Sequence, residues 1–153
     1  MNLYVLIRFF IGFLFIFSGL EKLLAPYQNF LYVIQSYDVL PDGFETAAAL
    51  SSPWIELFLG VFLVVGLWTQ WVLTGVRVLL AAFIFIVSQA IIRKLPLTEC
   101  GCFGEFLSLP LPVVVALDSI LWVLTVFLSR KIEIVSFMSL DNYFNEKESK
   151  SAR

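Results

Sequence analysis

The sequence alternates long apolar runs with short polar connections. Four runs are rich in Leu, Val, Ile and Phe, and each is long enough to cross a hydrocarbon core, which takes about 20 helical residues. They lie at Leu3–Leu24, Ala47–Leu67, Trp71–Ile92 and Leu109–Ser129. The residue alternation of a barrel strand is absent, and lipid offers no water to backbone groups, so we expect helices. The pattern predicts an all-α integral membrane protein, a bundle of four transmembrane helices.

The connections between the runs differ in character. The first contains the helix breakers Pro26 and Pro41, and its apolar spacing predicts a short amphipathic helix lying on the membrane. The apolar face of that helix would be Phe30, Leu31, Val33, Ile34 and Tyr37. The second is predicted to be a tight turn over residues 68–71, whose tryptophans suit the headgroup level. The third connection spans residues 93–108 and is a short polar break between two apolar runs.

Composition agrees with a membrane protein and excludes several functions. The chain is 60% hydrophobic and 14% charged, whereas a soluble domain is roughly half apolar and a quarter charged. The net charge of −2 is uninformative about partners, but the absence of a basic patch or nucleic-acid motif argues against a nucleic-acid partner. The absence of histidine excludes Ser-His and Cys-His catalysis and imidazole metal sites. The first run lacks a basic leader and a small-residue cleavage site, so we interpret it as a retained span rather than a signal peptide.

The distribution of basic residues predicts that both termini lie in the cytoplasm. The inner side would receive Arg130, Lys131 and a partly disordered tail over residues 131–153, with Arg8 and Arg77 able to snorkel towards it. The outer side would receive fewer basic residues, namely Lys22, Arg93 and Lys94. This orientation in an inner membrane puts the third connection outside the cytoplasm, where a disulfide can persist.

The third connection contains the only two cysteines, Cys100 and Cys102, separated by Gly101. Thiol–disulfide exchange needs an accessible thiolate with a resolving thiol beside it, and this spacing provides the second thiol. A disulfide between them would close a very small, strained ring, which is easily reduced. The pair therefore favours a redox role over a static disulfide. A closed zinc site is less favoured, because two thiolates without histidine need further ligands.

The start of the fourth run bears on thiol reactivity. Ser108 is a candidate N-cap and Pro110 fits a first helical turn, so the positive end of the helix dipole would lie near the thiols and favour the thiolate. The basic Arg93 and Lys94 act in the same direction, whereas the nearby Glu99 and Glu105 act against it.

Ionisable residues inside the runs are the second set of candidates, because they are costly in lipid and normally face the bundle interior. Helical spacing puts each on a stripe of polar and small residues. The four stripes are Arg8, Gly12, Phe15, Gly19 and Lys22; Ser52, Glu56, Gly60 and Leu63; Gln70, Thr74, Arg77, Ala81 and Ser88; and Asp118, Trp122, Thr125 and Ser129. Depth predicts that Glu56 lies near Lys22 and that Asp118 lies within reach of Arg8 or Arg77. These charges would either hold the helices in register or handle protons or quinone.

Two groups of motifs resemble known membrane families. Arg8, Gly12, Gly19 and Lys22 are similar to the opening signature of the DoxX-like membrane proteins. The segment Pro53-Trp54-x-Glu56-x-x-x-Gly60 and the Cys-Gly-Cys-Phe-Gly segment at residues 100–104 resemble the methylamine-utilisation protein MauE branch. The resemblance covers roughly residues 3–130, so we expect one four-helix domain over residues 1–130 and a separate cytoplasmic tail.

The resemblance implies a function in thiol redox chemistry. MauE proteins are associated with the maturation of methylamine dehydrogenase, whose small subunit carries many disulfides, and they work alongside a thioredoxin-like partner. Related DoxX and DoxD members are tied to sulfur redox chemistry with quinone as acceptor. The first hypothesis is a thiol–disulfide oxidoreductase in which Cys100 and Cys102 exchange with an extracytoplasmic thioredoxin-like protein, quinone is a candidate acceptor, and Glu56, Arg77 and Asp118 tune or shuttle protons. The second is a non-catalytic assembly factor with a static disulfide.

Overall fold

The computed structural model describes residues 3–41, 43–95 and 110–130. These residues form helices and no strands, and all of the helices except α2 are long and apolar enough to cross a membrane. The helices are α1 (Leu3–Leu24), α2 (Tyr27–Tyr37), α3 (Phe44–Val65), α4 (Thr69–Ile92) and α5 (Leu111–Ser129). The predicted all-α fold with four spanning helices is confirmed. The cytoplasmic placement of both termini stays a prediction, and the tail lies outside the described residues.

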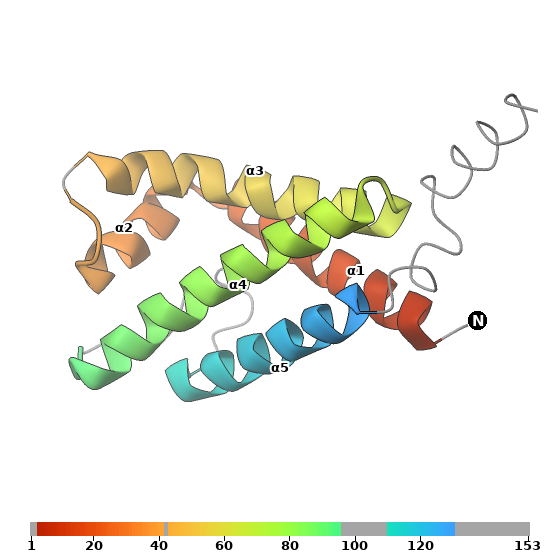
Figure 1. The fold of residues 1–153 in the computed structure, drawn as a ribbon. Helices are drawn as coiled ribbons and strands as arrows, with labels where there is room; N and C mark the ends of the chain where they lie inside the picture. The colour runs from red at the N-terminus through yellow and green to blue at the C-terminus, as the bar shows by residue number, and fades with distance from the viewer. Residues whose placement is uncertain (1–2, 42, 96–109, 131–153) are drawn as a thin grey trace, which may run out of the picture.

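The spanning helices pack as two pairs, α1 with α3 and α4 with α5 (Figure 1). One apolar cluster joins the two pairs, with Ile11 from α1, Leu63 from α3, Leu73 and Val76 from α4, and Leu121 from α5. Each of these five side chains is at most 4% exposed. Residues that face away from this cluster are mostly exposed Leu, Phe, Trp and Val, as expected for surfaces that contact lipid.

The short helix α2 confirms the amphipathic helix predicted in the first connection, and its position on the membrane surface stays a prediction. It begins after Pro26 and ends at Tyr37, where Asp38 adopts a left-handed conformation with φ 48°. Its apolar face packs against the bundle, since Tyr37 joins a second buried cluster with Val87 and Ala90 of α4 and with α5. Helix α2 therefore covers the end of the bundle where α1 ends and α3 begins (Figure 1).

The pair α1 and α3 approach closely because their contact face is built on glycines. A Cβ on Gly60 would lie 2.7 Å from the Ile16 backbone nitrogen and 2.8 Å from the Gly12 carbonyl oxygen. A Cβ on Gly19 would lie 2.8 Å from both the Leu57 nitrogen and the Pro53 oxygen. The whole predicted stripe of α1 is buried, which confirms the face deduced from its spacing.

The predicted contact face of α4 is wrong. Gln70, Thr74 and Ala81 are exposed, and the buried face is instead largely aliphatic. It consists of Thr69, Val72, Leu73, Val76, Leu80, Val87 and Ala90. The polar residues do not need the bundle interior, because the Thr74 hydroxyl donates to the Gln70 carbonyl of its own helix at 3.0 Å. On α5 the prediction holds for Asp118 and Thr125, which are buried, whereas Trp122 is 39% exposed.

Two predicted helix ends are also wrong. The turn between α3 and α4 lies two residues earlier than predicted, because Gly66 ends α3 in the left-handed region at φ 74° and α4 already begins at Thr69. Helix α5 begins at Leu111 with Pro110 as its N-cap, so the predicted cap at Ser108 is wrong. A proline in the first turn of this helix costs no hydrogen bond, and Pro112 occupies that place.

Candidate functional site

The described core contains a buried ion pair between α1 and α3. The Lys22 ammonium lies 2.7 Å from Glu56 Oε1 and 2.8 Å from Oε2, and both side chains are 1% exposed. Ser18, one turn before Lys22, donates to Glu56 Oε2 at 2.7 Å and accepts from Lys22 at 3.2 Å. The depth argument for Lys22 beside Glu56 is confirmed. Ser18 was missed, although its spacing of one helical turn from Lys22 places both on one face.

Two aromatic rings lie close to the Lys22 ammonium. Its nitrogen lies 5.1 Å from the centre of the Phe30 ring and 5.4 Å from that of Phe83. These rings come from α2 and α4, and cations are attracted to the faces of aromatic rings. The ion pair of α1 and α3 is thereby connected to two more helices.

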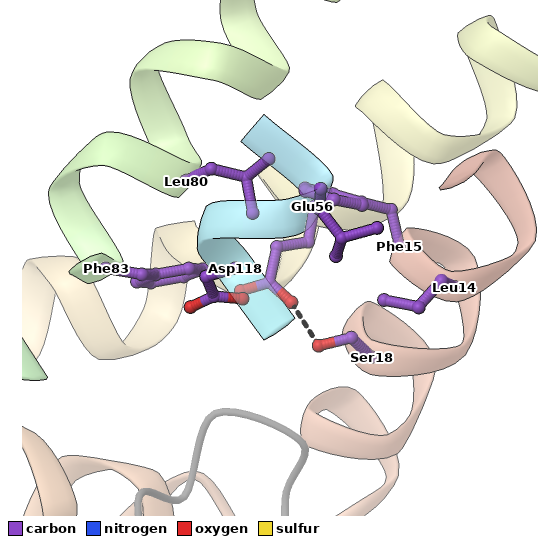
Figure 2. A pocket seen from close by; sticks show the side chains of 8 residues that line it. Leu14, Phe15, Ser18, Glu56, Leu80, Phe83 and Asp118 are labelled. Atoms are coloured by element: carbon purple, nitrogen blue, oxygen red, sulfur yellow. Dashed lines mark hydrogen bonds between the residues drawn. The ribbon is translucent and has the colours of Figure 1, made fainter. Parts of the chain in front are cut away.

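Asp118 of α5 completes the polar cluster. It is 3% exposed and lines a cavity of about 20 Å³ together with Glu56 and Ser18. Figure 2 shows the carboxyl groups of Glu56 and Asp118 directed into this cavity, whose other walls are Leu14, Phe15, Leu80, Phe83 and Leu121. Within the described part of the chain, Asp118 Oδ2 has no hydrogen-bond partner.

The predicted approach of Arg77 to Asp118 is wrong. The Arg77 guanidinium donates to Thr74 Oγ1 at 2.8 Å, to Ser129 Oγ at 3.4 Å and, through Nε, to the Leu73 carbonyl at 3.3 Å. Ser129 is at the far end of α5, about 16 Å from Asp118 at about 1.5 Å per helical residue. Arg77 therefore extends away from Asp118, towards the end of the bundle where α5 finishes.

Arg8 is also remote from the cluster. It is completely buried, with its guanidinium carbon 5.0 Å from the centre of the Phe9 ring. It precedes Lys22 on α1 by about 21 Å, again at about 1.5 Å per residue. Of the five ionisable candidates, the structure brings together Lys22, Glu56 and Asp118 and leaves both arginines outside that group.

A surface contact fixes the base of the cysteine connection. Arg93, at the end of α4, donates to the carbonyls of Tyr37 at 3.3 Å and Asp38 at 3.1 Å, and its Nη2 lies 3.1 Å from the Asp38 carboxylate. Burial of the neighbouring Tyr37 raises the pKa of its phenol to about 12. The end of α2 is thus tied to the residue from which the connection leaves. Cys100 and Cys102 themselves lie outside the described residues.

A larger apolar cavity of about 200 Å³ lies between α2, α3 and α4. Its lining includes Phe30, Tyr37, Phe83 and Ser52, and Ser52 Oγ is buried without a hydrogen-bond partner among the described residues. A smaller space of about 50 Å³ shares Phe30, Tyr37 and Phe83 with it and reaches Lys22. The described residues include no group of three or more His, Cys, Asp or Glu that could hold a metal ion.

Comparison with known proteins assigns the chain to a family. Residues 1–130 match the family model for "Methylamine utilisation protein MauE". The chain belongs to the MauE family. The chain is 30% identical over 104 residues to the methylamine utilization protein MauE of Paracoccus denitrificans. This match covers 68% of the chain and 55% of that relative, so the chain spans about half the length of this curated relative. No solved structure matches.

Membership confirms the resemblance to the MauE branch, whereas the DoxX-like resemblance stays a prediction. The family carries the name of methylamine utilisation, and the four apolar helices match a multi-pass membrane protein. The residues that match the MauE model include the cluster of Lys22, Glu56 and Asp118 as well as both cysteines.

Proposed function

We propose that this MauE-family protein exchanges thiols and disulfides at the outer surface of the inner membrane during methylamine utilisation. A thiolate of Cys100 or Cys102 attacks the disulfide of an extracytoplasmic thioredoxin-like protein and forms a mixed disulfide. The second cysteine then attacks that bond and releases the partner as a dithiol. The partner has gained two electrons, and the pair has lost them and become a disulfide. The reverse sequence oxidises the partner. The partner would in turn serve the maturation of disulfide-containing proteins such as methylamine dehydrogenase.

The observation that carries this proposal is the fixed base of the cysteine connection. One side leaves from Arg93, which is bonded to the end of α2, and the other side enters α5 at Pro110. Both ends are therefore anchored at the end of the bundle that α2 covers (Figure 1). We expect a reactive pair in a connection with this base to meet a soluble partner without partial unfolding of the bundle.

Quinone is the acceptor implied by the DoxX-like resemblance; it would take up the two electrons that the pair receives when it oxidises the partner, and the apolar cavity of about 200 Å³ supports it. Its walls are aromatic and aliphatic, and Ser52 offers one hydroxyl donor to a ring carbonyl. Pockets for whole drug-sized ligands begin at about 300 Å³, so this cavity fits a single ring and not the full isoprenoid tail. A bound quinone would supply two-electron acceptor chemistry. Phe30, Tyr37, Phe83 and Ser52 would hold its ring.

Cysteine variants test the exchange. We expect Cys100→Ser and Cys102→Ser each to abolish turnover of the partner, because a single thiol can attack but cannot resolve. The variant that keeps the attacking cysteine should accumulate a mixed disulfide, visible as a reducible band on a gel after acid quenching and alkylation. Thr98→Ser is the matched control, since it changes the same connection and leaves both thiols.

The non-catalytic assembly factor gives a different result. In that case the pair is oxidised throughout in cells, neither variant forms a mixed disulfide, and the partner keeps its normal redox state in both.

A further inference from the structure

Lys22 and Glu56 satisfy each other's charge and hydrogen-bonding needs, with Ser18, and leave Asp118 out. An ammonium has three donors, and Lys22 uses them on Glu56 Oε1, Glu56 Oε2 and Ser18 Oγ. The single positive charge of Lys22 is matched by the single negative charge of Glu56. No donor of Lys22 is left for Asp118, although all three residues lie at the same place in the bundle.

No other described cation supports an ionised Asp118. The walls that α4 contributes to the cavity are the apolar Leu80 and Phe83, and Asp118 is the only ionisable residue of α5. Arg77 is held at Ser129, about 16 Å away along the helix. Within the described part of the chain, Lys22 and Glu56 act electrostatically on Asp118, and their charges oppose each other.

An ionised carboxylate in apolar surroundings costs far more free energy than a neutral acid, so such a group becomes neutral by binding a proton. A protonated carboxyl has one O–H donor, which needs an acceptor. The adjoining cavity of about 20 Å³ exceeds the roughly 10–15 Å³ that one water molecule needs. Its polar walls are Asp118, Glu56 and Ser18, which meets the usual requirement of two to four partners for a buried water.

We propose that Asp118 is a proton-binding site within the membrane and that one water molecule in the adjoining cavity joins its carboxyl group to Glu56. The site lies where α5 meets the pair α1 and α3, so its charge acts on the contact between the two helix pairs (Figure 2). Loss of the proton places a second negative charge opposite Glu56 and repels α5. Low pH therefore favours the closed packing and high pH loosens it. The site does not depend on thiol exchange, so either proposal can fail alone.

Chemical labelling of the unmodified protein in lipid nanodiscs tests the site. Dicyclohexylcarbodiimide, an apolar reagent, reacts with protonated carboxylic acids. We expect mass spectrometry to locate its adduct on Asp118 at neutral pH, and we expect the adduct to disappear as the pH is raised. A modified Glu56 with an unmodified Asp118 would overturn the proposal, as would an Asp118 that stays unmodified down to acidic pH.

Infrared difference spectra provide a second measurement. The carbonyl stretch of a protonated carboxylic acid lies above the amide I band, and we expect Asp118→Asn to lose such a band that the wild type shows at neutral pH. Asp38→Asn is the matched control, since the Asp38 carboxylate is 78% exposed, and it should leave the band unchanged. If the band shifts in heavy water as expected for a strongly hydrogen-bonded Asp118 carboxyl group, this supports the bridging water. Identical spectra for wild type and Asp118→Asn would contradict the proton site.

Discussion

Replacing Lys22 by methionine is expected to destabilise the bundle by about 3–5 kcal/mol, because it leaves the Glu56 carboxylate buried without a counter-charge. Methionine fills a similar volume, so loss of packing contributes little. Glu56 is 1% exposed and cannot recover its lost solvation from water. The same change also removes the ammonium from between the Phe30 and Phe83 rings, which loosens the contacts with α2 and α4.

The double variant Lys22→Met/Glu56→Gln should recover much of that loss, since it buries no uncompensated charge at this pair. The measurement is equilibrium unfolding in mixed detergent micelles, with the four proteins of the double-mutant cycle compared. Lys94→Met is the control, because Lys94 is exposed and surface changes usually stay within about 0.5 kcal/mol. A Lys22→Met loss no larger than the control loss would show that the ion pair does not hold the helices together.

Gly60→Ala is expected to be the second most damaging single change, at about 1–3 kcal/mol, because overpacking of a close contact forces backbone shifts. The added methyl would meet the Ile16 nitrogen at 2.7 Å and the Gly12 oxygen at 2.8 Å, and backbone atoms on the facing helix cannot move aside. Gly19→Ala meets backbone atoms of α3 in the same way and should give a similar loss. Thermal unfolding of the purified protein in detergent measures both effects.

Gly75→Ala is the matched control for this test. Its methyl would meet only the side chain of Leu59, with the nearest carbon at 2.9 Å, and a leucine side chain can move. Alanine also favours a helix over glycine by about 1 kcal/mol. Equal losses for Gly75→Ala and Gly60→Ala would indicate that α1 and α3 do not need their close contact.

Prediction from the sequence was most successful where the bilayer restricts the choice of residues. Arg8 and Lys22 cannot face lipid cheaply and Gly12 and Gly19 permit close packing, so the contact face of α1 was correctly predicted. On α4 this restriction is absent. A leucine or valine side chain is as stable in contact with lipid as in the bundle. The Thr74 hydroxyl makes its hydrogen bond to a carbonyl of its own helix. The polar stripe of α4 therefore did not mark the buried face.

The candidate site was partly predictable for a related reason. The depth of a residue in the membrane can be deduced by counting residues along its helix, and this depth correctly placed Glu56 beside Lys22. The rotation and tilt of each helix cannot be deduced in this way. Residue depth therefore did not reveal that Asp118 joins the same cluster or that Arg77 turns away towards Ser129. The cavity between Asp118 and Glu56 is a result of packing, and no sequence pattern reports it.

Thiol exchange with an extracytoplasmic partner requires a cysteine pair that is presented outside the cytoplasm and changes its redox state. The direct measurement is gel-shift alkylation of Cys100 and Cys102 in intact cells, with one maleimide reagent that crosses the membrane and one that does not. We expect the impermeant reagent to modify both thiols after mild external reduction, and untreated cells to contain a mixture of dithiol and disulfide. Modification by the permeant reagent alone, or a pair that is oxidised throughout under all growth conditions, would contradict the account.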